Sequence, residues 1–147
     1  MAIATDIERT LAILKPDAVR RGLVGEIIAR FERKGMRIVA MKLIQISRPL
    51  AEKHYAEHKG KPFYESLLEF MCSEPAIVLV LEGQHAIPLL RLIMGATNPS
   101  QAAPGSIRGD YAHDLTFNLI HGSDGPESAA KEIALFFAPE ELVSYPD

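Results

Sequence analysis

The sequence predicts an α+β fold in which helices pack on one four-stranded antiparallel sheet. A length of 147 residues suits one domain that can bury a sizeable core. Short apolar runs of strand length alternate with segments of helical period. Their order is strand–helix–strand, helices, strand–helix–strand, which gives two β-α-β halves and matches the ferredoxin-like βαββαβ motif. We therefore expect residues 1–147 to form a single domain of this class.

The first strand and the first helix are predicted close to the N-terminus. Residues 10–14 form a short apolar run that indicates a buried strand, and Lys15-Pro16-Asp17 indicates the turn that ends it. Apolar residues at helical spacing then predict a helix that ends at Gly35. The apolar face of this helix consists of Leu23, Val24, Ile27, Ile28 and Phe31.

The middle of the chain predicts a second strand followed by two helices. Residues 36–46 are rich in apolar and β-branched side chains, which is typical of a strand. A helix is expected over residues 47–58, with Pro49 in its first turn, because proline fits the start of a helix. A second, shorter helix is expected over residues 62–71.

The second half predicts another strand, helix and strand. Residues 76–81 are continuously apolar and indicate a buried strand, and residues 86–94 carry an apolar helical face that ends at Gly95. Residues 95–116 contain prolines and glycines without a clear period, so we expect irregular structure there. Such a long irregular segment usually means either a function or a wrong assignment of the elements. The fourth strand is predicted over residues 117–120.

Residues 104–132 are the stretch in which function is expected. The fourth strand ends directly before His121, and a turn then leads into a helix that starts at Pro126 and carries Glu132. A helix N-terminus next to a histidine is a plausible place for phosphate, because its free N–H groups favour anions. A single histidine beside Gly122 is nevertheless more often structural, so this assignment needs further residues.

Composition narrows the possible partners and the cellular location. The net charge of −3 gives no global basic field, which argues against nucleic-acid binding. The single cysteine excludes an internal disulfide and a four-cysteine zinc site, and it suits a reducing compartment. The N-terminus lacks the features of a signal peptide, and no apolar run approaches the roughly 20 residues that span a bilayer. We therefore predict a cytoplasmic protein that does not bind membranes.

The segment His54-Tyr55-Ala56-Glu57-His58 allows two interpretations. It matches H-x-x-E-H, a zinc-protease pattern that places two histidines one helical turn apart. Zinc would need a third protein ligand from another element. The neighbouring charged residues Lys53 and Lys59 favour the alternative, a solvated surface helix.

Three basic residues point to a local phosphate site. Lys15 follows the first strand, Arg91 lies in an apolar helix, and Arg108 lies in the long irregular segment. Arginine binds phosphate oxygens through paired hydrogen bonds, whereas lysine acts as a point charge. Together with Thr97, Asn118 and His121, they would form a phosphate site if the fold brings them together. The P-loop, the G-x-G-x-x-G pattern and the protein-kinase signatures are absent from the sequence, which argues against those enzyme classes.

Six segments of the chain resemble the nucleoside diphosphate kinase family, and the resemblance as a whole runs from about Glu8 to Val143. They are LKPDAV at 14–19, RRGLVGEII at 20–28, HYAEH at 54–58, MGATNP at 94–99, PGSIRGDY at 104–111 and NLIHGSD at 118–124. The resemblance implies transfer of the γ-phosphate of a nucleoside triphosphate, typically ATP, to a nucleoside diphosphate. It further implies a ping-pong mechanism through a phosphohistidine, with low base selectivity.

The resemblance also implies a role for individual residues. His121 would be the nucleophile, supported from behind by Glu132 and Ser123. The residues implied to bind the nucleotide are Lys15, Tyr55, Phe63, Leu67, Arg91, Thr97, Arg108, Leu115 and Asn118. Lys15 and Tyr55 would also act in catalysis, Phe63 would stack on the base, and Lys15 and Asn118 would reach the sugar hydroxyls. Mg²⁺ would be the cofactor, held mainly by the nucleotide phosphates and not by a dedicated protein site.

Some expectations remain open at this stage. Family members form hexamers or tetramers, and we favour a hexameric homo-oligomer slightly. Gly125 stands where many relatives have serine as the helix cap, and little should change there because glycine caps a helix nearly as well. Phe117 is bulkier and more apolar than the residue often found at its position, which leaves the local detail of the base pocket open. A regulatory module that only binds nucleotide is the competing class. Because His121, Asn118 and Glu132 are all present, and mere binding needs no nucleophile, we favour an enzyme.

Overall fold

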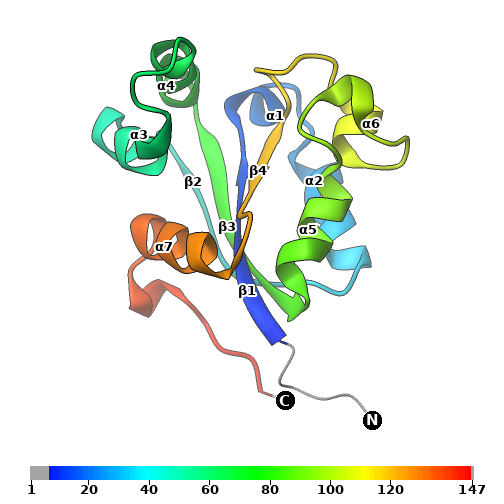
Figure 1. Ribbon diagram of the computed structural model, residues 1–147. Coiled ribbons are helices and arrows are strands. Elements are labelled where there is room, and N and C mark those ends of the chain that lie inside the picture. Colours follow the sequence, from blue (N-terminus) through cyan, green and yellow to red (C-terminus); the bar gives the residue numbers. More distant parts are fainter. Residues whose placement is uncertain (1–6, 147) are drawn as a thin grey trace.

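The computed structural model describes residues 7–146, which form one sheet covered by helices on both faces (Figure 1). The sheet has four strands in the order β2-β3-β1-β4, and each neighbouring pair is antiparallel. The strands are β1 (Ile7–Leu14), β2 (Arg37–Ile44), β3 (Ala76–Gln84) and β4 (Ile120–Gly122). The predicted fold class is confirmed. The domain extent of 1–147 stays a prediction, because residues 1–6 and 147 lie outside the described part.

Helices pack against the sheet from both sides. The α-helices are α1 (Pro16–Arg20), α2 (Val24–Arg33), α3 (Arg48–His54), α4 (Tyr64–Ser73), α5 (Ala86–Met94), α6 (Ile107–Tyr111) and α7 (Pro126–Phe136). Short 3₁₀ turns cover η2 (Ala56–His58), η3 (Pro99–Gln101) and η4 (Pro139–Glu141). Figure 1 shows α3, α4 and α7 on one side of the sheet and α2, α5 and α6 on the other.

Each face of the sheet carries its own hydrophobic core, as the alternation of side chains along a strand requires. Leu11 and Ile13 of β1 belong to the core under α3, α4 and α7. Ala12 and Leu14 belong to the core under α2 and α5. All four residues have no exposed surface. The second half of β1 is therefore buried from both faces of the sheet, and it provides a rigid base for its neighbour β4.

Helix boundaries differ from the sequence expectation in three places. The turn expected after β1 is the short helix α1, with Pro16 in its first turn. The helix expected over 47–58 starts after a Ser47 cap but ends at His54, because Tyr55 leaves the helical conformation. Residues 95–116, expected to be irregular, contain η3 and α6. Ser106 starts α6 by accepting a hydrogen bond from Gly109 N.

The fourth strand begins later than predicted. The backbone N–H groups of Thr116 and Phe117 bond to the Asp114 carboxylate and not to a neighbouring strand. Leu119 has a φ of 76°, which is incompatible with a strand. Pairing starts only at Ile120, so His121 lies inside β4 and not after its end.

Candidate active site

A cavity of about 500 Å³ brings together residues from six separate segments of the chain. We call it the His121 cavity. Ten of the residues singled out from the sequence line it: Lys15, Tyr55, Phe63, Leu67, Arg91, Thr97, Arg108, Leu115, Asn118 and His121. The remaining two, Ser123 and Glu132, contact each other, and Glu132 contacts His121. The fold therefore assembles the set that sequence spacing alone could not bring together.

Two buried cations line this cavity. Lys15 is 9% exposed, and its Nζ donates to Asn118 Oδ1 at 2.8 Å. Burial, with the Arg108 charge adding to it, lowers the pKa of Lys15 to about 8. Arg108 is 4% exposed and donates to the carbonyls of Asn118, Gly95 and Ile120 at 3.2, 3.1 and 2.5 Å. Since burial lowers the pKa of Arg108 only to about 10, both side chains carry charge at neutral pH.

Close backbone packing places Arg108 at this position. A Cβ at Gly109 would lie 2.0 Å from the carbonyl oxygen of Ala103, so only glycine allows α6 to pack against the preceding turn. A third cation, Arg91 of α5, reaches the same cavity and donates from Nη1 to the Gly122 carbonyl at 3.2 Å. Three cations from three separate elements thus converge beside β4.

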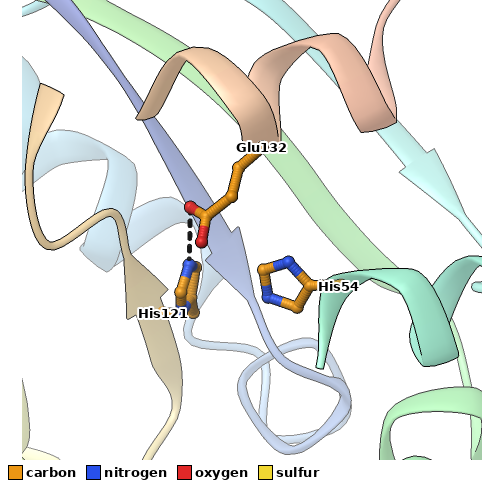
Figure 2. A group of neighbouring side chains, drawn as sticks. All are labelled: His54, His121 and Glu132. Carbon is orange, nitrogen blue, oxygen red and sulfur yellow. Dashed lines mark hydrogen bonds and ion pairs between the residues drawn. The ribbon is translucent and has the colours of Figure 1, made fainter. Parts of the chain in front are cut away.

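His121 is held from behind by a carboxylate. Its Nε2 lies 3.0 Å from Glu132 Oε1 (Figure 2). The Ser123 hydroxyl donates to the same oxygen at 2.7 Å. Burial alone would raise the pKa of Glu132. The hydrogen bond and the charge of His121, together with the hydrogen bond from Ser123, have the larger effect, so the pKa of Glu132 is lowered. Glu132 is therefore ionised and favours the tautomer with its proton on Nε2. The lone pair of His121 is then on Nδ1, which no described residue hydrogen-bonds.

Apolar and more exposed side chains also line this cavity. Phe63 is 47% exposed and Leu115 is 60% exposed, so both present apolar surface to an incoming ligand. Tyr55 is 8% exposed, and its buried hydroxyl has no hydrogen-bond partner among residues 7–146. Burial raises the pKa of Tyr55, so this hydroxyl stays a hydrogen-bond donor. Phe117 does not line the cavity and instead packs edge-on against Phe70 at 4.9 Å.

The helix N-terminus expected to bind phosphate beside His121 lies elsewhere. Pro126 does start α7 after a Gly125 cap, as predicted. However, Asp124, Gly125 and Pro126 line a second cavity of about 470 Å³, and none of them lines the His121 cavity. We call this second space the α7 cavity. The positive charge of the His121 cavity comes from the side chains of Lys15, Arg91 and Arg108, and not from the N-terminus of this helix.

His54 is the site residue that the sequence interpretation missed. The surface-helix interpretation is wrong for this residue, because its ring packs at right angles to His121, with centroids 4.7 Å apart. His54 follows Ala51 by three positions and Leu50 by four, and both contribute to the core, so the helical period already placed His54 on the inner face. His58, by contrast, stacks beside Tyr55 and lines the His121 cavity.

Comparisons with known proteins agree with this geometry. The family model described as nucleoside diphosphate kinase matches residues 8–142. The chain belongs to this family. Nucleoside diphosphate kinases from Thermococcus kodakarensis and Carboxydothermus hydrogenoformans are each 61% identical to it, over 95% of this chain and over 82% and 93% of their own lengths.

Solved structures of family members show the same fold. The halophilic nucleoside diphosphate kinase from Halobacterium salinarum, in complex with CDP, superposes with a TM-score of 0.93 at 48% identity, covering 95% of this chain and 93% of that one. A family protein from Babesia bovis gives 0.92 at 43% identity, covering 95% of each chain. The protein is thus a nucleoside diphosphate kinase, a phosphotransferase that moves the γ-phosphate of a nucleoside triphosphate to a nucleoside diphosphate. None of the helices in residues 7–146 has the length and apolar character needed to cross a bilayer.

Proposed function

We propose that Nδ1 of His121 is the atom that carries the phosphoryl group between the two nucleotides. The observation that supports this most directly is the bond between His121 Nε2 and Glu132, which leaves the other nitrogen as the nucleophile. In the first step the Nδ1 lone pair attacks the γ-phosphorus, the bond to the β-phosphate oxygen breaks, and the nucleoside diphosphate leaves. In the second step a terminal oxygen of the acceptor diphosphate attacks phosphorus and the P–N bond breaks. The ring becomes cationic when Nδ1 is phosphorylated, and the Glu132 carboxylate compensates that charge.

The three cations of the His121 cavity are proposed to position and neutralise the phosphates. Phosphoryl transfer has a loose transition state, so catalysis is mainly positioning and charge stabilisation. Lys15, Arg91 and Arg108 converge on one end of the cavity, and two of them are fixed by hydrogen bonds to backbone carbonyls. Tyr55 and Thr97 add hydroxyl groups to the same lining. This arrangement supports the phosphate-binding roles that the sequence resemblance implied.

The nucleoside end of the ligand is proposed to occupy the open apolar part of the cavity. Phe63 would stack on the base, with Leu67 and Leu115 beside it. Stacking does not distinguish bases, because every base has a π-face, so low base selectivity follows. Asn118 and Lys15 are hydrogen-bonded to each other at 2.8 Å, which supports a shared role at the sugar hydroxyls.

Magnesium is proposed as the cofactor, bound chiefly through the nucleotide phosphates. The polar groups of the cavity fit this arrangement. Cations and neutral oxygens line it, whereas no carboxylate among the described residues does. Mg²⁺ is usually held by substrate phosphates with few protein ligands, and it would neutralise phosphate charge when bound.

A homo-oligomer, with a hexamer slightly favoured over a tetramer, is also proposed. The edge strand β2 supports an assembly, because Met41 and Leu43 are 51% and 62% exposed on an unpaired sheet edge. A cytoplasmic location, and the absence of nucleic-acid binding, stay predictions from the sequence.

The phosphohistidine is tested by incubating the protein with γ-labelled ATP and Mg²⁺. We expect label on the protein that is acid-labile and base-stable, that moves to added GDP, and that is missing in His121→Ala. His113→Ala is the matched control, because His113 does not line the His121 cavity and should keep full labelling. Label that persists in His121→Ala would refute the assignment of this histidine. Nucleotide binding without any label in the unmodified protein would favour a binding module.

A further inference from the structure

We propose that His54, His121 and Glu132 form a binding site for a divalent transition metal such as Zn²⁺, and that the bound metal prevents phosphorylation of His121. The first part concerns metal binding alone. The second part rests on the proposed role of His121 as the phosphorylated residue. Metal binding and labelling of His121 are measured separately, so metal binding can hold even if the bound metal does not prevent phosphorylation.

The three side chains come from three elements and converge on one point. One ligand atom from each of His54, His121 and Glu132 lies within 4.8 Å of the others. Figure 2 shows α3, β4 and α7 each contributing one of these side chains. Two imidazoles and one carboxylate are a common protein ligand set for Zn²⁺. Around a tetrahedral ion with bonds of about 2.0–2.1 Å, ligand atoms lie about 3.3 Å apart, so small side-chain rotations would close the site.

His54 has the properties that a metal-binding side chain needs. Both of its ring nitrogens are buried and have no hydrogen-bond partner in the described part of the chain. Leaving buried polar atoms unpaired costs free energy, so such atoms call for an explanation. Burial, with the neighbouring His121 adding to it, lowers the pKa of His54 to about 3. The imidazole is therefore neutral at physiological pH, which is the form that binds metals.

The α7 cavity gives a route to these ligands that does not pass through the His121 cavity. His54 and Glu132 line it, together with further carboxylates of Glu57, Asp124 and Glu127. Lys53 and Lys131 are the basic residues of the same lining, so carboxylates outnumber lysines along the approach. A negative approach favours a cation. The metal would reach the rear of His121 while a nucleotide could still occupy the opposite side.

Metal binding and phosphorylation would exclude each other through the His121 tautomer. In the metal-free protein the proton lies on Nε2, beside Glu132, and the lone pair is on Nδ1. A metal bound to Nε2 requires the lone pair there, so the single proton of the neutral ring moves to Nδ1. Nδ1 then has no lone pair with which to attack phosphorus. The metal would therefore slow phosphohistidine formation without weakening nucleotide binding.

The site is distinct from the H-x-x-E-H pattern noted in the sequence. That pattern pairs His54 with His58, but His58 Nδ1 lies 3.3 Å from Lys61 Nζ, and its ring packs near Phe63. The metal-ligand group among the described residues contains His54 without His58. His58→Phe is therefore a matched control for His54→Phe, because both changes replace an imidazole by a ring of similar shape on one segment.

The test of the first part measures binding of Zn²⁺ by calorimetry and of Co²⁺ by its visible absorption. The full-length protein should bind one equivalent of metal, and His58→Phe should bind it equally well. His54→Phe and His121→Ala should each weaken binding by more than about 100-fold, because each removes a direct ligand. His54→Gln, which keeps a polar side chain, guards against loss of folding, with thermal unfolding as the check. Undiminished binding in a folded His54 variant would overturn the site.

The test of the second part measures labelling by γ-labelled ATP with and without Zn²⁺, at constant Mg²⁺, relative to each variant's own metal-free rate. One equivalent of Zn²⁺ should slow labelling of the unmodified protein and of His58→Phe, but not of His54→Phe. Addition of Zn²⁺ should not change the affinity of any of these three proteins for ADP. Equal labelling rates with saturated metal would overturn the exclusion. Failure of the proposed phosphohistidine would appear differently, as no label even without Zn²⁺, while the metal-binding readout stays interpretable.

Discussion

The carboxylate of Glu132 should set the rate at which His121 is phosphorylated, without affecting how tightly nucleotide binds. Glu132 is 15% exposed at its side chain, so solvent screens its bond to His121 only weakly. Hydrogen bonds to charged groups contribute about 1.5–3 kcal/mol, roughly twice the value for neutral pairs. In Glu132→Gln the amide oxygen can still accept both bonds, and only the charge is lost. The expected cost is about 1–2 kcal/mol, or about 5- to 30-fold in rate.

Complete removal of the side chain should cost more. Glu132→Ala removes the acceptor for both His121 and Ser123, so we expect about 1.5–3 kcal/mol, or about 10- to 150-fold in rate. Rapid-quench measurement of label incorporation from γ-labelled ATP gives this rate, and equilibrium binding of ADP gives the affinity. Glu127→Gln is the matched control, because this residue lies on the same helix but does not contact His121.

Two outcomes would refute this reasoning. If Glu132→Gln labelled as fast as the unmodified protein, the carboxylate charge would have no role in activating His121. If ADP affinity fell by the same factor as the labelling rate, Glu132 would act on binding and not on the chemical step. The graded order, in which the alanine variant is slower than the glutamine variant, separates loss of charge from loss of the hydrogen bond.

Three further predictions concern the cavity and its scaffold. With a pKa of about 8, Lys15 is charged below that pH and loses its charge above it, so kcat/KM for nucleotide should fall as pH rises through about 8. This fall should be absent in Lys15→Arg, and a flat profile in the unmodified protein would contradict the assignment. Phe63→Ala should raise KM for purine and pyrimidine nucleotides by similar factors, which correspond to a loss of up to about 1 kcal/mol of binding free energy for this half-exposed ring. Steady-state kinetics with several nucleotides test this prediction, and a rise in KM for only one base would contradict stacking. Gly109→Ala should cost about 1–3 kcal/mol of stability and lower Tm by several degrees, because its Cβ meets the Ala103 backbone. Gly25→Ala, with no atom within 4 Å of the new Cβ, should leave Tm unchanged or slightly higher in the same calorimetric scan.

Residue patterns predict the elements that extend over several turns or pleats. Helix α5 was expected over residues 86–94 and has those bounds, because its apolar face and its glycine cap both appear in the sequence. Strand β3 was also expected, although it continues beyond the apolar run to Gln84. For both elements, the local conformational propensity and the burial of apolar side chains favour the same secondary structure.

Elements that depend on contacts between distant residues could not be predicted in this way. The short helix α6 lies in a segment rich in proline and glycine, and its position depends on the close approach of Gly109 to Ala103. The late start of β4 depends on the positive φ of Leu119, which the identity of leucine does not indicate. The grouping of His54 with His121 requires knowledge of how α3 meets β4 and α7. The ten cavity residues were likewise named from residue chemistry and from the family resemblance, and only the fold shows that they line one cavity.

In the His121 cavity, the end proposed to bind phosphate is tightly packed, and the end proposed to bind the base is open. His121 pairs with Ile13, a fully buried residue of β1, so its backbone is fixed from one side. From the other side α5 packs so closely that a Cβ at Gly122 would lie 2.5 Å from Met94 Sδ. The same helix supplies Arg91, which bonds to the Gly122 carbonyl and is thereby fixed relative to the histidine.

A reaction that depends on positioning needs this rigidity where the phosphates bind. A kinase that accepts many bases does not need it where the base binds. Accordingly, the side chains proposed for the base, Phe63 and Leu115, are about half exposed, whereas Lys15 and Arg108 are almost fully buried. Substitutions at the open end should therefore change KM, and substitutions at the packed end should change the rate of phosphoryl transfer.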